Sequence, residues 1–180
     1  MSTRKQATKQ QPRSENTGPA PVATRPRFPK EYGVPSHSKG LLPWSHATER
    51  LTKAEHYWIC TVNADRPHAT PVDGVWLNDC LYFGGSPEAR WRRNLSANGA
   101  MSVHLENAMD VVMLEGNARI EPVSHAFAEQ LAEVSNKKYG YGMPASEYEK
   151  NGVLTFRPRV AFAWTNIGKD STRFEFGGAG

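Results

Sequence analysis

The sequence predicts a mainly β fold, a small antiparallel barrel that carries capping helices. Short runs rich in β-branched and aromatic residues recur from residue 57 to residue 120, and short turns separate them. Amphipathic helical patterns are inserted among these runs, as in small closed barrels with helices at their ends. With 180 residues, the chain has room for one ordinary domain and a tail, but not for a large α/β barrel of about 250 residues.

The basic charge of the chain is concentrated at its N-terminus. Residues 1–40 hold eight Lys or Arg and two acidic residues, so the net charge of +4 leaves residues 41–180 at −2. The same forty residues hold six of the 13 prolines and no Ile, Leu or Trp, too little apolar surface to offset the entropy lost on ordering. We therefore expect a disordered basic arm over residues 1–40 and a folded domain over residues 41–180. The arm is either a solvated leader or a loose contact for nucleic acid or an anionic surface.

The composition argues against a membrane protein and a secreted protein. No run approaches the roughly 18 consecutive apolar residues of a membrane span. Met1–Gln6 leads into no apolar segment of the kind that signal peptides contain. Cys60 and Cys80 fall inside apolar runs without zinc-ligand spacing, which favours two buried free thiols over a disulfide. We expect a cytoplasmic protein without a metal site.

The first part of the folded domain predicts a helix and an antiparallel meander. Ser45 can cap a helix that runs to about Glu55. Tyr57–Val62 is β-branched and aromatic, and a short turn connects it to a second strand over Pro67–Leu77. Asn78-Asp79 is a two-residue turn of the kind that tight hairpins use, and it leads into a third strand, Cys80–Phe83.

The second part alternates helices and strands. Ser86, followed by a proline and a glutamate, predicts the start of a helix that ends near Ala97. Alternation of apolar and polar residues predicts a strand over Ala100–Glu106, and a further strand follows over Val111–Ile120. A helix after Ser124 ends at Gly140. The last strands are expected at Val160–Thr165 and Thr172–Phe176.

Polar side chains gather on one face of the helix that is predicted over residues 86–97. At 100° per residue, this face collects a hydroxyl, two guanidiniums and an amide: Ser86, Arg90, Arg93 and Asn94. Trp91 and Leu95 form an adjacent face that we expect in the core, and Arg92 points away from Arg90. Guanidiniums match phosphate oxygens in a bidentate manner, and the free amides at a helix start add to the attraction. The pattern indicates either a phosphate site or a solvated basic helix face.

Five stretches of the sequence carry a resemblance to a known family. They are Thr61-Val62 with Arg66–Val72, Gly74–Leu77, Leu81–Phe83, Arg90–Leu95 and Val103–Glu106, and the segment Phe162–Phe174 extends the match. In order and spacing, these stretches resemble the pyridoxamine 5′-phosphate oxidase-like, FMN-binding split β-barrel family. They are most similar to its branch of flavin- and deazaflavin (coenzyme F420)-dependent oxidoreductases. The resemblance covers roughly residues 44–176.

The resemblance implies a six-stranded antiparallel split β-barrel that forms a homodimer, with the cofactor in a groove between the subunits. It assigns the cofactor phosphate to Ser86, Arg90, Arg93 and Asn94. It assigns the back of the flavin-type ring to Thr70, Pro71 and Val72, where backbone groups would tune the ring. It lets two residues reach the site from the partner subunit, Trp164 and Arg173.

The expected function is that of an oxidoreductase that binds FMN or coenzyme F420 and transfers a hydride to or from a small organic substrate. The sequence contains no nucleophile elbow and no nucleophile–base signature, which is consistent with a cofactor that carries the chemistry. No catalytic residue is assigned. FMN and coenzyme F420 both need a ring groove and a phosphate site, and the acidic tail of coenzyme F420 also needs a basic groove. The alternative is a non-catalytic module that binds a flavin or haem on the same barrel for sensing or sequestration.

Overall fold

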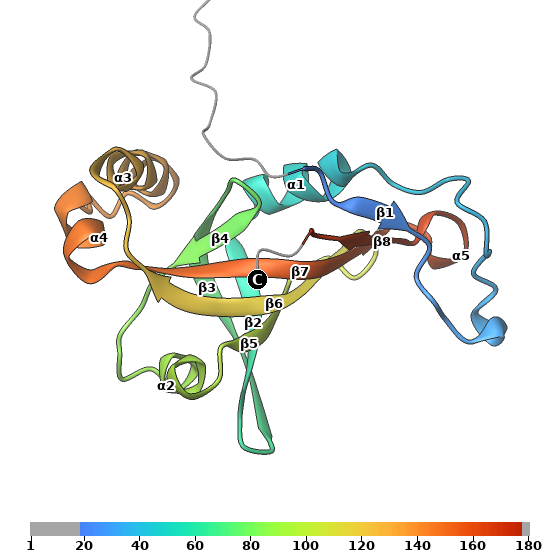
Figure 1. Ribbon diagram of the computed structural model, residues 1–180, viewed down its shortest axis with the longest axis horizontal. Coiled ribbons are helices and arrows are strands. Elements are labelled where there is room, and N and C mark those ends of the chain that lie inside the picture. The colour runs from blue at the N-terminus through green and yellow to red at the C-terminus, as the bar shows by residue number, and fades with distance from the viewer. Residues whose placement is uncertain (1–18, 178–180) are drawn as a thin grey trace, which may run out of the picture.

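The computed structural model describes residues 19–177, in which strands form the body and helices lie around it (Figure 1). The strands are β1 (Val22–Thr24), β2 (His56–Asn63), β3 (Arg66–Leu77), β4 (Cys80–Phe83), β5 (Ala100–His104), β6 (Val111–Glu121), β7 (Val153–Trp164) and β8 (Thr172–Glu175). The helices are α1 (Trp44–Lys53), α2 (Arg90–Ala97), α3 (His125–Tyr139), α4 (Ala145–Asn151) and α5 (Ile167–Asp170), with a 3-10 turn, η1, at Lys30–Tyr32.

The eight strands form one antiparallel sheet that closes on itself. Their order is β1-β8-β7-β4-β3-β2-β5-β6, and β6 also pairs with β7. This last pairing joins six strands into a ring, so the predicted six-stranded antiparallel barrel is confirmed. Strands β8 and β1 extend the sheet outside the ring, beside β7.

Short turns set the register of the meander β2-β3-β4. The turn between β3 and β4 is Asn78-Asp79, and both residues have positive φ, 51° and 55°. This is the backbone of a tight hairpin turn whose twist matches the strands, as the sequence predicts. The β2–β3 hairpin has eight paired residues on each strand, against four in the β3–β4 hairpin, and its tip projects from the barrel (Figure 1).

Strand β7 begins at Val153, seven residues before the predicted start at Val160. The sequence contains Pro158 inside this stretch, and a proline cannot donate a ladder hydrogen bond. In the structure, Pro158 lies opposite Gly116, where the register of the β6–β7 pair shifts at a β-bulge. The bulge removes the need for a donor at that point, so the strand continues through the proline.

The prediction of a disordered arm over residues 1–40 is corrected for residues 19–40, while residues 1–18 lie outside the described part. Strand β1 pairs with β8 along its three residues. The Arg25 side chain then fastens the chain by donating to several backbone carbonyl oxygens, including that of Ser171 at 2.7 Å. Composition alone missed this order because backbone pairing and one arginine hold the segment, and only two prolines of it, Pro21 and Pro26, are buried.

Helix α2 begins at Arg90, four residues after the predicted cap at Ser86. The chain makes a turn first, because the Ala89 N–H donates to the Ser86 carbonyl oxygen at 3.0 Å. The Ser86 hydroxyl accepts from the Glu88 N–H at 3.2 Å. Such local hydrogen bonds of a serine compete with helix formation, so Ser86 shapes the turn instead of the helix.

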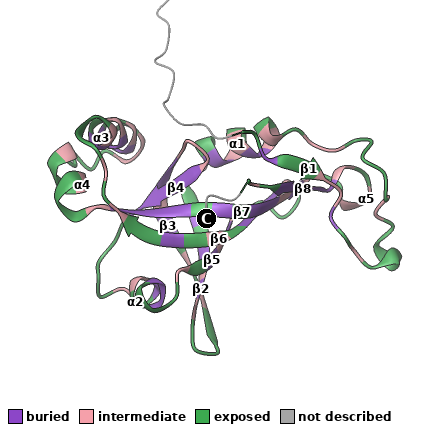
Figure 2. Cartoon of the chain, in the orientation of Figure 1, coloured by how far each residue is buried: buried purple, intermediate pink, exposed green. Residues whose placement is uncertain are grey.

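Two hydrophobic clusters hold the fold together. The larger one fills the barrel, and Figure 2 shows buried residues along the strands. The smaller one fastens α3 to the outside of β3 and β4 through Leu131, Val75 and Tyr82. Helix α3 follows Ser124, as predicted, and Gly140 ends it with φ of 72°. The Ser124 side chain caps the helix by accepting from the Phe127 N–H. Both cysteines are free thiols; Cys80 is buried and Cys60 is half-buried.

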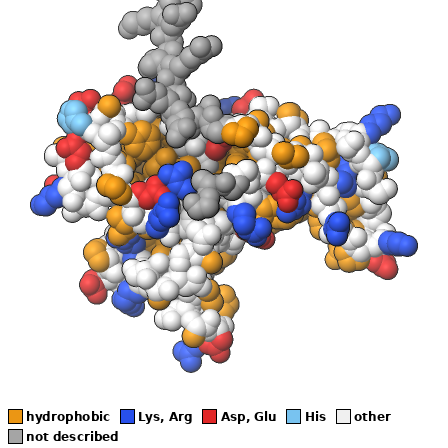
Figure 3. Space-filling model, in the orientation of Figure 1, with side chains coloured by type: hydrophobic (Ala, Val, Ile, Leu, Met, Phe, Trp, Pro, Cys, Tyr) orange, Lys and Arg blue, Asp and Glu red, His pale blue; other side chains and the backbone are white. Residues whose placement is uncertain are grey.

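On the face shown in Figure 3, acidic and basic side chains are interspersed with hydrophobic ones, and neither sign of charge forms a continuous patch. Within residues 19–177, no helix is both long and apolar enough to cross a membrane.

Candidate functional site

Two neighbouring cavities lie where β3, β4 and the start of α2 meet. The larger has a volume of about 580 Å³ and lies between the barrel and the helices α3 and α4. The smaller is an open groove of about 370 Å³ between β3 and the loop that leads into α2. Asp73, Gly84 and Gly85 line both of them, so the two cavities share a wall.

The smaller groove contains part of the predicted cofactor site. Pro71 and Val72 line it from β3, and Ser86 lines it from the loop. Thr70 precedes Pro71 on the same strand and is half-buried. Trp91 forms another part of the wall, where its indole packs so closely on Gly85 that a Cβ there would lie 2.5 Å from the ring. The backbone at Gly85 therefore needs glycine to keep Trp91 in place.

The structure separates the four residues that were predicted to share one face of α2. Arg90 and Arg93 are exposed near the start of the helix, and Ser86 is exposed in the preceding turn. Asn94 faces the barrel instead, with 1% of its surface exposed, and its amide donates to the Thr61 hydroxyl at 3.0 Å. The later start of the helix leaves Ser86 outside the helical repeat, so the 100° spacing does not apply to it.

The two residues that were predicted to come from a partner subunit lie away from both cavities. Trp164 ends β7, and its ring meets Phe28 edge-on at a centroid distance of 6.3 Å. Arg173 lies in β8 and forms an ion pair with Glu175. Neither residue lines either of these two cavities, so a role for them there requires a second copy and stays a prediction.

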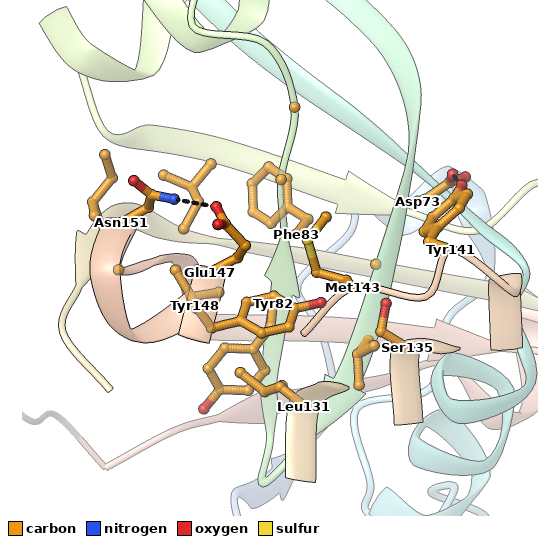
Figure 4. Close-up of a pocket in the computed structure, with 18 of the residues that line it drawn as sticks. Asp73, Tyr82, Phe83, Leu131, Ser135, Tyr141, Met143, Glu147, Tyr148 and Asn151 are labelled. Atoms are coloured by element: carbon orange, nitrogen blue, oxygen red, sulfur yellow. Dashed lines mark hydrogen bonds between the residues drawn. The ribbon is translucent and has the colours of Figure 1, made fainter. Parts of the chain in front are cut away.

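Tyrosines dominate the wall of the larger cavity, which Figure 4 shows in close-up. Tyr82 points into it from β4 and Tyr148 from α4. Tyr139 and Tyr141 follow one another around the end of α3, and their rings stack at a centroid distance of 5.3 Å with an interplanar angle of 13°. Aliphatic side chains and Met143 add to the apolar lining. Polar side chains also line the cavity, and they are Asp73, Arg92, Ser135, Glu147 and Asn151.

A hydrogen-bonded chain of three side chains connects the two cavities. His56 Nδ1 lies 2.8 Å from one carboxylate oxygen of Asp73, and the Tyr141 hydroxyl donates to the other oxygen. His56 lines the smaller groove and Tyr141 the larger cavity. The hydrogen bond to Asp73 raises the pKa of the Tyr141 hydroxyl, because the neighbouring carboxylate disfavours a phenolate.

The end of α3 is fastened to β3 beside this chain. The Tyr139 hydroxyl accepts from the Gly74 N–H at 2.9 Å and donates to the Glu55 carbonyl oxygen at 2.6 Å. Lys138 Nζ donates to the Gly74 carbonyl oxygen at 2.7 Å. Burial lowers the pKa of Lys138 to about 8 and raises the pKa of Tyr139 to about 12. These contacts position the two stacked tyrosines at the cavity wall.

Sequence reasoning missed most residues of the larger cavity. Arg92, which was expected to point away from the predicted site, lines this cavity. Tyr139 and Tyr141 were assigned to a helix end and a loop without a role. The available signal was the spacing Tyr-Gly-Tyr, in which a helix-ending glycine separates two aromatic residues that the helical core pattern does not use.

No protein-family model matches the sequence, and a search of curated proteins finds no match. Solved structures do resemble the chain. A NimC/NimA family protein from Clostridium acetobutylicum has a TM-score of 0.58 at 13% identity, covering 73% of this chain and 91% of that one. An FAD-binding protein from Mesorhizobium loti has a TM-score of 0.54 at 16% identity, covering 75% and 96%. A candidate pyridoxamine 5′-phosphate oxidase from Listeria innocua has a TM-score of 0.52 at 16% identity, covering 65% and 94%.

The chain has the pyridoxamine 5′-phosphate oxidase-like split-barrel fold. The match spans nearly the whole length of each of these proteins, and the six-stranded ring agrees with it. The resemblance read from the sequence therefore predicted the fold of the split barrel correctly. At 13–16% identity, the similarity establishes the fold and not the chemistry of the two cavities.

Proposed function

We propose that this split barrel binds a flavin-type cofactor, FMN or coenzyme F420, in the smaller groove and transfers a hydride between it and a small organic molecule. One observation carries the proposal. The backbone of β3 and the Gly84-Gly85-Ser86 segment face each other across this groove, directly before a helix that begins with exposed arginines. The FAD-binding protein from Mesorhizobium loti shares the fold, which supports a cofactor of this kind.

The start of α2 fits the phosphate end of such a cofactor. Arg90 and Arg93 are exposed there and can donate two hydrogen bonds each in the fork geometry that phosphate oxygens accept. The first N–H groups of the helix have no intrahelical acceptor, and a phosphate can satisfy them. The Ser86 hydroxyl supplies a further donor. Asn94 is left out of this phosphate site because its amide already faces Thr61 in the barrel.

The β3 side of the groove fits the ring end. Pro71 and Val72 line the groove there, and Thr70 precedes them along the strand. Opposite them, a Cβ on Gly84 would meet nothing within 4 Å, so the backbone there is open to close approach by a ligand. When bound, the flavin-type ring would supply the hydride acceptor or donor, and the protein would orient it and exclude water on the barrel side.

The groove is open on one side, which supports a second copy of the chain as its cover. In that homodimer, Trp164 and Arg173 of the second copy would approach the cofactor. Of the basic side chains that could serve the acidic tail of coenzyme F420, Lys138 is turned inward onto Gly74, whereas Lys137 is exposed and Arg92 lines the larger cavity. Both cofactors therefore remain in the proposal.

The test is a titration of the purified, ligand-free full chain with FMN, FAD, coenzyme F420 and haem, followed by absorbance or fluorescence. We expect tight binding of FMN or coenzyme F420. Arg90→Ala and Arg93→Ala should each raise the Kd roughly tenfold or more, because each removes a charge-assisted contact worth about 1.5–3 kcal/mol. Arg66→Ala, at the tip of the β2–β3 hairpin, is the matched control and should leave the Kd unchanged.

The outcomes separate the alternatives. Unchanged affinity in both arginine variants would remove the phosphate assignment. Binding of haem alone would favour the non-catalytic module that sequesters haem. Tight flavin binding without turnover of any organic acceptor would favour a storage or sensing role, whereas turnover faster than that of free flavin would identify an enzyme.

A further inference from the structure

We propose that the larger cavity binds the organic substrate, and that this substrate is a flat aromatic molecule that carries a hydroxyl group. Its role as a substrate rests on the function proposed above, whereas the binding itself does not. The cavity volume of about 580 Å³ falls within the range of roughly 300–1,000 Å³ that is typical of small-molecule sites. The shared wall at Asp73, Gly84 and Gly85 places the cavity next to the groove assigned to the cofactor.

The exposed apolar side chains at this cavity indicate that a ligand binds there. Among the described residues, seven large hydrophobic side chains are exposed, and three of these line this one cavity. They are Ile120, Tyr141 and Met143. Grouping of exposed apolar surface around a concavity is typical of a binding site, while single exposed residues elsewhere are ordinary.

The aromatic lining favours a flat ligand. Tyr139 and Tyr141 stack nearly parallel and form one plane of the wall, and Tyr82 and Tyr148 reach the cavity from β4 and α4 (Figure 4). Aromatic rings bind other rings in offset-stacked or edge-on arrangements, which add to the energy of apolar burial. The hydrogen bonds of Tyr139 to the β3 backbone hold this plane in place without a ligand.

The polar edge at Asp73 favours a ligand that donates a hydrogen bond. The Tyr141 O–H is directed to the Asp73 carboxylate, so the Tyr141 oxygen keeps its lone pairs for a donor from the cavity. His56 occupies the other carboxylate oxygen. A hydroxyl on an aromatic ring can therefore donate a hydrogen bond to the Tyr141 oxygen, while the Tyr141 O–H keeps its own hydrogen bond to Asp73. An ether or an unsubstituted ring offers no such donor.

The test uses two probes of the same ring system, 2-naphthol and 2-methoxynaphthalene, titrated into the full chain by calorimetry with and without FMN. We expect saturable binding of 2-naphthol, roughly tenfold tighter than binding of 2-methoxynaphthalene. Tyr141→Phe keeps the ring and removes the acceptor, so the two probes should bind it equally. Tyr32→Phe is the matched control, because Tyr32 is equally exposed, 58% against 57% for Tyr141, and lies in η1 away from the cavity.

A second variant, Asp73→Asn, should also reduce the preference for 2-naphthol, and Tyr148→Ala should weaken both probes. Equal binding of the two probes to the natural chain would overturn the inference, as would a preference that survives Tyr141→Phe. Displacement of 2-naphthol by FMN would overturn it too, because the cavity would then belong to the cofactor. If FMN fails to bind while 2-naphthol binds with the expected Tyr141 dependence, the proposed function fails and the ligand site stands.

Discussion

Arg25 donates hydrogen bonds from one guanidinium to four backbone carbonyl oxygens. Two of them, on His37 and Lys39, belong to the segment before α1, and two, on Lys169 and Ser171, belong to the segment around α5. The donor–acceptor distances run from 2.7 to 3.2 Å. One side chain therefore connects two parts of the sequence that are more than a hundred residues apart.

Arg25→Ala is expected to lower the free energy of unfolding by about 1–3 kcal/mol, because four backbone carbonyl oxygens lose their hydrogen bonds to the guanidinium and bond to water instead. The measurement is urea denaturation followed by tryptophan fluorescence. Limited proteolysis should show faster cleavage between residues 26 and 40. Arg27→Ala, at an exposed position two residues later, serves as the control. Equal stability of the two variants would contradict a fastening role for Arg25.

Gly116 lies at the β-bulge of β6, where the strand crosses the backbone of β7 closely. A Cβ at this position would lie 2.0 Å from the carbonyl oxygen of Arg157, which is backbone and cannot move aside. Gly116→Ala is therefore expected to destabilise the fold by about 1–3 kcal/mol, as overpacking does. Gly84→Ala, where a Cβ meets nothing within 4 Å, should be nearly neutral in the same thermal unfolding experiment. Comparable melting temperatures for the two variants would refute the close approach.

At the scale of elements, two polar side chains near the C-terminal end of helix α3 fasten the helix to the barrel. Lys138 and Tyr139 both reach Gly74 in the middle of β3, and the Lys138 ammonium lies 4.8 Å from the centroid of the Tyr57 ring. Hydrogen bonding and the aromatic face compensate part of the cost of burying the charge. The lowered pKa of Lys138, about 8, shows that burial outweighs these gains.

This balance predicts a pH dependence of stability. The pKa of Lys138 is about 8 in the folded chain and 10.5 as its ordinary value, so the unfolded chain binds more protons between these two values. The contribution of Lys138 to the free energy of unfolding should therefore rise as the pH rises from 8 toward 10.5, and be lost as the pH falls through 8. Because the side chain is only half-buried, solvent screening leaves an effect of about 1 kcal/mol.

The measurement compares the natural chain with Lys138→Met by urea denaturation at pH 7 and pH 9.5. The stability difference between them should shift in favour of the natural chain at the higher pH. Lys137→Met, at the exposed neighbouring position, should show no such shift. A difference that is independent of pH would mean that Lys138 titrates normally.

Local sequence patterns predicted the elements that local interactions determine. The Asn78-Asp79 turn, the start of α3 after Ser124 and the end of α3 at Gly140 follow from backbone chemistry within a few residues. The start of β7 and the order of residues 22–24 depend on partners more than thirty residues away, and no local pattern contains them. Of the polar face predicted on α2, Arg90 and Arg93 are exposed as expected, while Asn94 is buried. The sequence analysis assigned Asn94 to the exposed face, whereas its amide faces the barrel and donates to the buried Thr61 hydroxyl. Helical spacing alone does not show that such a buried partner exists.

At the scale of the whole molecule, the folded unit is larger than the domain that composition predicted, residues 41–180. A chain that begins at residue 19 keeps β1 and Arg25, while a chain that begins at residue 41 loses both. We expect the shorter chain to melt about 3–10 °C lower, since a few kcal/mol correspond to that shift for a protein of this size. Differential scanning calorimetry of the two chains makes the comparison, and equal melting temperatures would restore the boundary at residue 40.

Closure of the barrel leaves little backbone unpaired, and β1 covers what remains. The ring gives its six strands a neighbour on each side, whereas β8 would be an open edge without β1. Unpaired edges of this kind recruit strands from other copies of a chain. A strand of only three residues offers a poor template, so β1 ends the sheet where a longer strand would extend it. Release of the Arg25 contacts would free β1 and expose the edge of β8 to strands of other copies. We then expect the protein to aggregate while its barrel is still folded.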